Sequence, residues 1–169
     1  MTAITEGALT FTFPDEALVC KYDETAFYRN QFIKMAGGIK AMDLVFVDNQ
    51  TFWLIEVKDY RVHRRTKAIE LADEIAGKLC NTLAGLWAAK CNANDQNERQ
   101  FAAAAINTSK MCVVLHLEEP PQQGRLFHQK TLKTGVLQKM KQKLKSVDAH
   151  PCLVDQHSLK PAMNWTVTG

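Results

Sequence analysis

Two apolar runs on either side of a short turn-prone segment constrain the fold of this chain more than any other feature. The runs cover Ala41 to Val47 and Phe52 to Tyr60, and Asp48-Asn49-Gln50-Thr51 lies between them. Asparagine and aspartate favour tight turns because their side chains hydrogen-bond the local backbone and tolerate left-handed conformations. The pattern therefore predicts an antiparallel β-hairpin.

Charged side chains interrupt the apolar hairpin at defined positions. Successive side chains of a strand point to opposite faces, so Glu56 and Lys58 share one face. If the turn is centred between Asn49 and Gln50, Asp43 lies opposite Glu56, with the two Cβ atoms about 4.5 to 5.5 Å apart. A turn of three or five residues would shift this pairing by one residue.

Two opposed carboxylates repel each other unless a cation lies between them. Mg²⁺ binds oxygen ligands and is commonly held by one or two carboxylates together with waters and substrate phosphates. A metal held by Asp43 and Glu56 would polarise a phosphodiester and activate a water. Lys58 would then orient that water or stabilise the charge that develops on the phosphate. The alternative is that these charges form only the solvated face of an edge hairpin.

The remaining segments predict helices around a mixed sheet. Apolar runs predict further strands at Leu9–Phe13, Met111–Leu117 and Pro151–Asp155. Three- and four-residue apolar spacing predicts helices at residues 66–90 and 132–147. Asp23 is a candidate N-cap for a helix at residues 25–32, and a further helical segment covers residues 98–107. Trp53 and Trp87 are expected to anchor the core. We expect one α/β domain over residues 1–169, with a mixed central β-sheet flanked by helices.

The hairpin residues resemble the motif of the PD-(D/E)xK nuclease superfamily, which has the restriction-endonuclease-like fold. Asp43 is followed by twelve residues and then by Glu56-Val57-Lys58, and each carboxylate lies in a strongly apolar segment. The resemblance covers residues 23–90 and extends more loosely to Leu117. Met42 stands where the name of the motif has proline. The resemblance implies a restriction-endonuclease-like core.

The resemblance also implies a role for each motif residue. By position, the metal ligands would be Asp43, Glu56, the backbone carbonyl of Val57 and, from the helix before the hairpin, Glu24. Asp23 or Glu16 could take the place of Glu24. Lys58 would be the catalytic lysine. The implied cofactor is Mg²⁺ or Mn²⁺, and the implied reaction is the hydrolysis of phosphodiester bonds by an endonuclease or exonuclease.

Basic residues follow the hairpin directly and form a candidate nucleic-acid-binding segment. They are Arg61, Arg64, Arg65 and Lys67. A second basic segment, from Arg125 to Lys145, holds one arginine and six lysines and no acidic residue. Such segments supply salt-sensitive affinity for phosphate backbones. For the second segment, a solvated helix face is an equal alternative.

Taken together, these patterns predict a metal-dependent nuclease with DNA as its expected substrate. The first alternative is a catalytically inactive nuclease-fold protein that serves as a nucleic-acid-binding or assembly subunit. The second is a structural or protein-interaction domain in which the hairpin charges are incidental. A homodimer or a larger complex stays open. No G-x-S-x-G elbow and no glycine-rich phosphate loop supports a serine hydrolase or a nucleotide-binding protein.

Composition restricts the cellular location. No apolar run has the length of a membrane span, and the N-terminus lacks the pattern of a secretory signal. The five cysteines form no C-x-x-C pair, and their odd number in a chain without export signals indicates reduced thiols. We therefore expect a cytoplasmic protein without a membrane partner. The net charge of +3 only weakly favours a polyanionic partner.

Overall fold

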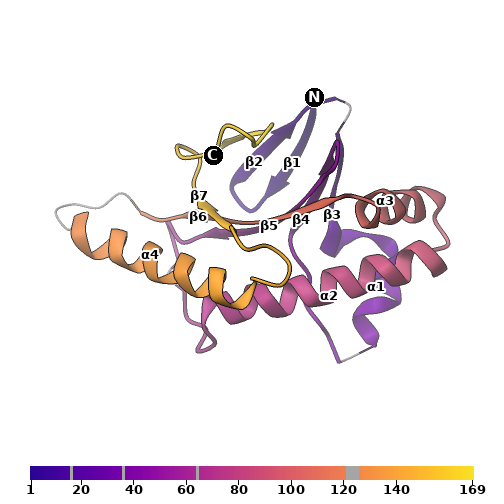
Figure 1. The fold of residues 1–169 in the computed structure, drawn as a ribbon, viewed down its shortest axis with the longest axis horizontal. Helices are drawn as coiled ribbons and strands as arrows, with labels where there is room; N and C mark the ends of the chain where they lie inside the picture. Colours follow the sequence, from indigo (N-terminus) through magenta and orange to yellow (C-terminus); the bar gives the residue numbers. More distant parts are fainter. Residues whose placement is uncertain (16, 36, 64, 121–125) are drawn as a thin grey trace.

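The chain folds into three stacked layers, which are a small sheet, a larger sheet and a group of helices (Figure 1). The structure, a computed structural model, describes residues 1–15, 17–35, 37–63, 65–120 and 126–169, and only the backbone within residues 126–132. Within this part of the chain, no helix is long and apolar enough to cross a membrane.

The larger sheet is mixed and has five strands in the order β3-β4-β5-β6-β7. Its strands are β3 (Leu18–Lys21), β4 (Leu44–Asp48), β5 (Thr51–Asp59), β6 (Lys110–Glu118) and β7 (Cys152–Val154). The β3–β4 and β4–β5 pairs are antiparallel, whereas β5–β6 and β6–β7 are parallel. The predicted α/β class with a mixed central sheet is confirmed.

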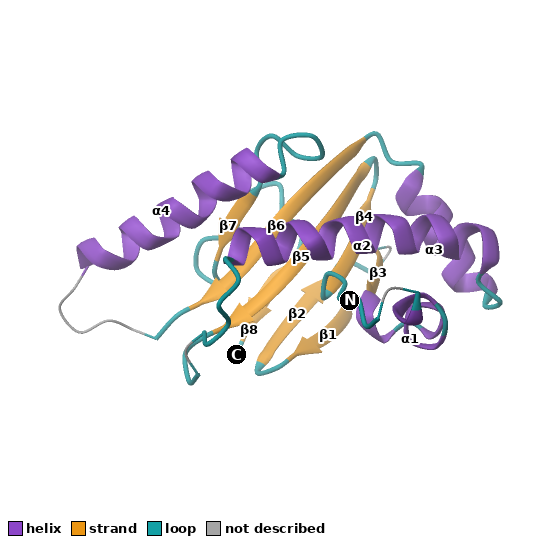
Figure 2. Ribbon diagram, turned by 90° about the horizontal axis from the view of Figure 1, so that it is seen from below, coloured by secondary structure: helices purple, strands orange, loops and turns teal. Residues whose placement is uncertain are grey.

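Helices cover one face of this sheet, and α2 lies across it with α4 beside it (Figure 2). The helical elements are η1 (Tyr22–Glu24), α1 (Ala26–Asn30), η2 (Phe32–Lys34), α2 (Leu71–Asn92), α3 (Gln96–Ile106) and α4 (Leu126–Lys143). The helix predicted at residues 25–32 is present but shorter, because α1 lies between the two 3-10 turns, and the predicted Asp23 cap is wrong, because the N-cap residue is Thr25. The carboxylate of Glu98 caps α1 instead, since it accepts hydrogen bonds from the amides of Ala26 and Phe27 at 2.6 and 2.9 Å.

A three-stranded antiparallel sheet covers the other face of the larger sheet. It has the order β1-β2-β8, with β1 at Thr2–Glu6, β2 at Leu9–Phe13 and β8 at Thr166–Thr168. The sequence predicted β2 but neither of its neighbours. β1 is mostly exposed and β8 has three residues, so neither carries a strong apolar pattern.

Because the larger sheet is covered on both faces, it separates two apolar cores. In β5, Leu54 faces the helices, whereas Trp53, Ile55 and Val57 face the small sheet. β6 is likewise buried on both faces, as its continuous apolar run predicted. Trp53 is 6% exposed and is a core residue, as expected. The expectation for Trp87 is wrong, because this side chain lies on the solvent face of α2 and is 60% exposed.

Candidate functional site

The hairpin has the register that a symmetric turn predicts. Asp48 pairs with Thr51, and Leu44 pairs with Ile55. Leu44 is the last paired residue of β4, so Asp43 is its direct neighbour just outside the ladder. Asn49 has a φ of 52°, the left-handed conformation that asparagine tolerates best among residues with a side chain. The Asp43 carboxylate accepts a hydrogen bond from the Val57 amide at 2.8 Å. Asp43 therefore lies against the part of β5 that carries Glu56.

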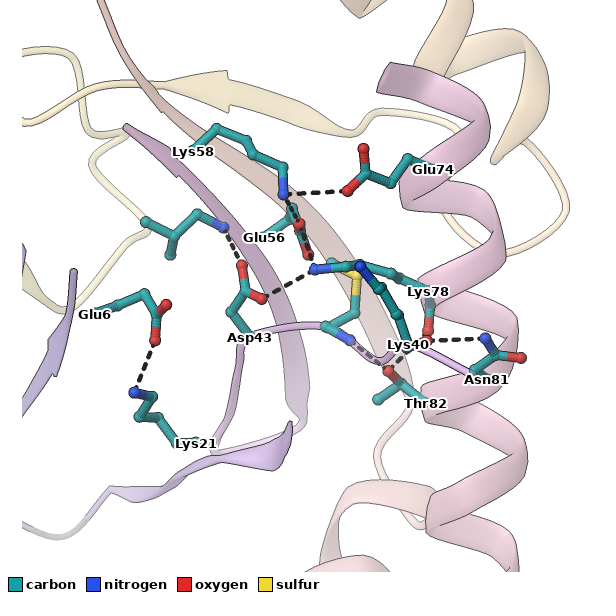
Figure 3. A network of polar contacts seen from close by, with 12 residues as sticks. Glu6, Lys21, Lys40, Asp43, Glu56, Lys58, Glu74, Lys78, Asn81 and Thr82 are labelled. Carbon is teal, nitrogen blue, oxygen red and sulfur yellow. Dashed lines mark hydrogen bonds and ion pairs between the residues drawn. The ribbon is translucent and has the colours of Figure 1, made fainter. Parts of the chain in front are cut away.

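Lys78 of α2 joins the two carboxylates. Its Nζ lies 3.0 Å from Asp43 Oδ1 and 2.6 Å from Glu56 Oε1. Figure 3 shows Lys78 reaching from α2 toward both acids. Glu56 is fully buried, and Asp43 and Lys78 are each 8% exposed. The opposed carboxylates are therefore held together by an ammonium group.

Lys58 extends this network along the same face of β5. Its Nζ lies 2.5 Å from Glu56 Oε1 and 3.3 Å from Glu74 Oε1 of α2. Glu74 also pairs with Arg65 at 2.7 Å and with Lys67 at 2.5 Å. The network therefore connects the hairpin, the segment after it and α2 through alternating charges.

Burial and charge set the protonation of this network. Burial, and then the neighbouring Asp43, raises the pKa of Glu56 to about 7, although Lys78 and Lys58 act against the rise. Burial also opposes ionisation of Glu74, but hydrogen bonds from Lys67 and Arg65 outweigh it and lower its pKa to about 2. Burial alone would lower the pKa of Lys78, but Glu56 and Asp43 outweigh it and raise the pKa. Lys78 therefore stays charged, while Glu56 titrates near neutral pH.

Thr82 fixes the backbone next to the network. Its hydroxyl accepts a hydrogen bond from the Met42 amide at 2.9 Å and donates one to the Lys78 carbonyl at 2.8 Å. Thr82 is fully buried, so both bonds are protected from water. They hold the residue before Asp43 against the turn of α2 that carries Lys78.

The sequence prediction missed Lys78, Glu74 and Thr82, although the helical period carries a signal for them. The apolar residues Ile75 and Leu79 define the buried face of α2. A glutamate, a lysine and a threonine spaced four residues apart fall on that same face. Charged side chains at core positions need partners of opposite charge, and the hairpin supplies them.

The arrangement does not fit a metal centre. The ammonium of Lys78 contacts both carboxylates, at the place where a metal between Asp43 and Glu56 would lie. In the described residues, no group of three or more His, Cys, Asp or Glu side chains could hold a metal ion. Binding of Mg²⁺ or Mn²⁺ by Asp43, Glu56 and Val57 stays a prediction.

The acids proposed as a further ligand lie apart from this network or outside the described residues. The Glu24 carboxylate pairs with Lys21 at 2.8 Å, its side chain is 55% exposed, and no described contact joins it to Asp43 or Glu56. Burial, and then repulsion from Asp43, raises the pKa of Asp23, which is therefore nearer to the network. Glu16 lies outside the described residues.

Most of the predicted nucleic-acid-binding cations have internal partners. Arg61 donates to both oxygens of Asp59, at 2.9 and 2.7 Å, and Arg65 and Lys67 pair with Glu74. Arg64 lies outside the described residues. On α4, Lys139 pairs with Glu70, and Lys143 with Asp73. These ion pairs hold the loop after β5, and nucleic-acid binding by the first basic segment stays a prediction.

Comparison with known proteins gives one informative similarity. No model of a known protein family matches the chain, and no solved structure matches it. A cysteine–tRNA ligase of Neisseria meningitidis serogroup A / serotype 4A is 32% identical over 157 residues, which cover 75% of this chain and 22% of the ligase. The chain therefore spans about a fifth of the length of this relative.

This relative corrects the functional prediction. The sequence pattern predicted a nuclease, either active on DNA or catalytically inactive, whereas the similar protein is a ligase that joins cysteine to tRNA. The prediction failed because a short motif specifies only a few side chains. It does not specify which residue of α2 lies between the carboxylates of Asp43 and Glu56. Here that residue is Lys78, whose ammonium already pairs with both carboxylates. The resemblance to the PD-(D/E)xK superfamily itself stays a prediction.

Proposed function

We propose that this chain is an auxiliary tRNA-binding domain that works with cysteine–tRNA ligation without carrying out the aminoacylation itself. The similarity to part of a cysteine–tRNA ligase is the observation that carries the proposal, because it extends over 75% of this chain. The matched part is 22% of the ligase, so most of that protein has no counterpart in the match. A domain that adds affinity for the RNA substrate fits such a partial match.

The residues of the chain support binding rather than ligation. Ligation of an amino acid consumes a nucleotide, and one of the motifs that bind nucleotides, a glycine-rich phosphate loop, is not found in the sequence. In the buried network, the carboxylates of Asp43 and Glu56 pair with the ammonium groups of Lys78 and Lys58, which suits a structural role. Activity in the ligation reaction would therefore come from the rest of a ligase-like protein.

Several lysines are available to an RNA backbone. Among the described residues, Lys34, Lys40, Lys90, Lys141 and Lys145 have no acidic partner within ion-pair distance. Unpaired cations release counterions when they contact phosphates, and this release provides salt-sensitive affinity. These lysines replace the paired Arg61, Arg65 and Lys67 as the expected phosphate contacts.

The proposal also places the protein in the cytoplasm. All five cysteines are free, which suits a reducing compartment, and no described helix could span a membrane.

The direct test is equilibrium binding of the purified chain to labelled tRNA, measured by fluorescence anisotropy at several salt concentrations. We expect saturable binding that weakens as salt rises, and tighter binding to tRNA than to a DNA duplex of similar length. A pyrophosphate-exchange assay with cysteine and ATP should give no activity with the chain alone. Equal affinity for tRNA and duplex DNA, no binding at low salt, or cysteine activation by the isolated chain would each contradict the proposal.

A further inference from the structure

The solvent face of α2 carries an exposed tryptophan that the core does not explain. Trp87 is 60% exposed, whereas the chain's other tryptophans, Trp53 and Trp165, are 6% and 4% exposed. The residues one turn away on the same face, Ala84 and Cys91, are exposed and uncharged. Because these neighbours are small, the indole is accessible to a flat ligand.

A cation lies next to this indole. The Nζ of Lys90 is 5.3 Å from the centroid of the Trp87 ring, and Lys90 has no acidic partner among the described residues. One face of the ring thus lies near a positive charge, and the residue as a whole is 60% exposed. An aromatic platform with a neighbouring cation suits a ligand that combines a planar ring with a negative charge.

Two further lysines come from segments that pack on the same helix. Gly85 of α2 meets the ring of Phe32, which precedes Lys34 in η2. Asn81 of α2 donates a hydrogen bond from its side chain to the Lys40 carbonyl at 2.8 Å. Neither Lys34 nor Lys40 has an acidic partner among the described residues. Lys34 and Lys40 are therefore two further unpaired cations on segments that pack against α2.

We propose that Trp87 is a stacking platform for an unpaired base of tRNA and that Lys90 contacts a phosphate beside that base. This inference rests on the proposed tRNA-binding function and names the surface that provides it. Bases within a duplex cannot stack on a side chain without being unstacked, so the platform takes a nucleotide from a loop or a free end. Lys34 and Lys40 add phosphate contacts that do not depend on sequence.

The test uses Trp87 both as the binding residue and as the probe. Because Trp87 is the exposed tryptophan of the three, stacking of a base should quench the intrinsic fluorescence of the wild-type protein when tRNA is added. Trp87→Ala should weaken binding about five- to 100-fold in the anisotropy assay. Trp87→Phe should keep most of the affinity and lose the quenching. Val62→Ala removes another exposed apolar side chain and should change neither readout.

A second pair of variants tests the phosphate contact. Lys90→Ala should reduce the slope of log Kd against the logarithm of the salt concentration by about one, the change expected for the loss of one phosphate contact. Lys160→Ala removes the same charge from the segment before β8, which packs on the opposite face of the larger sheet, and should leave the salt dependence unchanged.

The outcomes separate this inference from the proposed function. If the wild-type protein binds tRNA and Trp87→Ala binds equally well, the stacking surface is wrong and the tRNA-binding function stands. If the wild-type protein binds no tRNA, the proposed function itself fails. Sedimentation of the wild-type protein as a dimer, and of Trp87→Ala as a monomer, would show that a second copy covers this face, and would overturn the assignment to RNA.

Discussion

The raised pKa of Glu56 gives a quantitative prediction about stability. The carboxyl group is fully buried, and its pKa in the folded protein is about 7 compared with 4.5 for an ordinary glutamate. Because the folded state holds this proton more tightly than the unfolded state, the stabilisation is fully present below pH 4.5. It is lost as the pH rises through 7. The whole effect corresponds to about 3 kcal/mol of unfolding free energy, of which about 2.5 kcal/mol falls between pH 5 and pH 8.

The assay is urea unfolding followed by tryptophan fluorescence at a series of pH values, for the wild-type protein and for Glu56→Gln. Glutamine cannot titrate, so the wild-type free energy minus that of the variant should fall by about 2.5 kcal/mol from pH 5 to pH 8. The subtraction matters because burial lowers the pKa of His116, which acts in the opposite direction in this range.

A surface carboxyl provides the matched control. The pKa of Glu24 is lowered, first by a hydrogen bond from Lys21, so Glu24→Gln should not alter the dependence between pH 5 and pH 8. A difference between the wild-type protein and Glu56→Gln that stays constant over this range would refute the reasoning. Glu56 would then be ionised throughout, and the two lysines would compensate for its burial completely.

Two further predictions concern α2. Lys78→Met should destabilise the protein by about 3 to 5 kcal/mol at pH 8, because it leaves two buried carboxylates facing each other, and by less at pH 5, where Glu56 is protonated. Lys141→Met, without an acidic partner to lose, should change the urea midpoint little. Gly85→Ala should destabilise by about 1 to 2 kcal/mol, because the added Cβ would collide with the Tyr22 hydroxyl. A Cβ added at Gly77 meets no atom, so Gly77→Ala should stabilise the protein by about 0.5 to 1 kcal/mol. An equal gain from Gly85→Ala would show that the Tyr22 side chain moves aside without cost and would contradict the prediction.

The sequence predicted the hairpin in detail because its determinants are local. The turn residues fixed the loop length, and loop length fixes which residues face each other across two strands. Alternation then placed Glu56 and Lys58 on one face, as the structure confirms. β6 was predicted from its composition for the same reason, since a strand that is buried on both faces needs an apolar side chain at nearly every position.

The errors lie where a segment depends on distant partners. Residues 22–34 form three one-turn elements, and α1 is capped by Glu98, a residue more than seventy positions away. Trp87 fits the apolar spacing of α2 as well as Leu86 does, but only packing decides that Leu86 is buried and Trp87 is exposed.

The sequence by itself determined the mixed α/β class, the hairpin register and the shared face of the charged residues, because these follow from short-range periodicity and turn chemistry. Only the tertiary structure decided the state of the site. The approach of α2 to the hairpin places Lys78 between Asp43 and Glu56, and the burial of that contact sets their protonation. The distance between α2 and the hairpin depends on packing over the whole sheet, which no local pattern encodes.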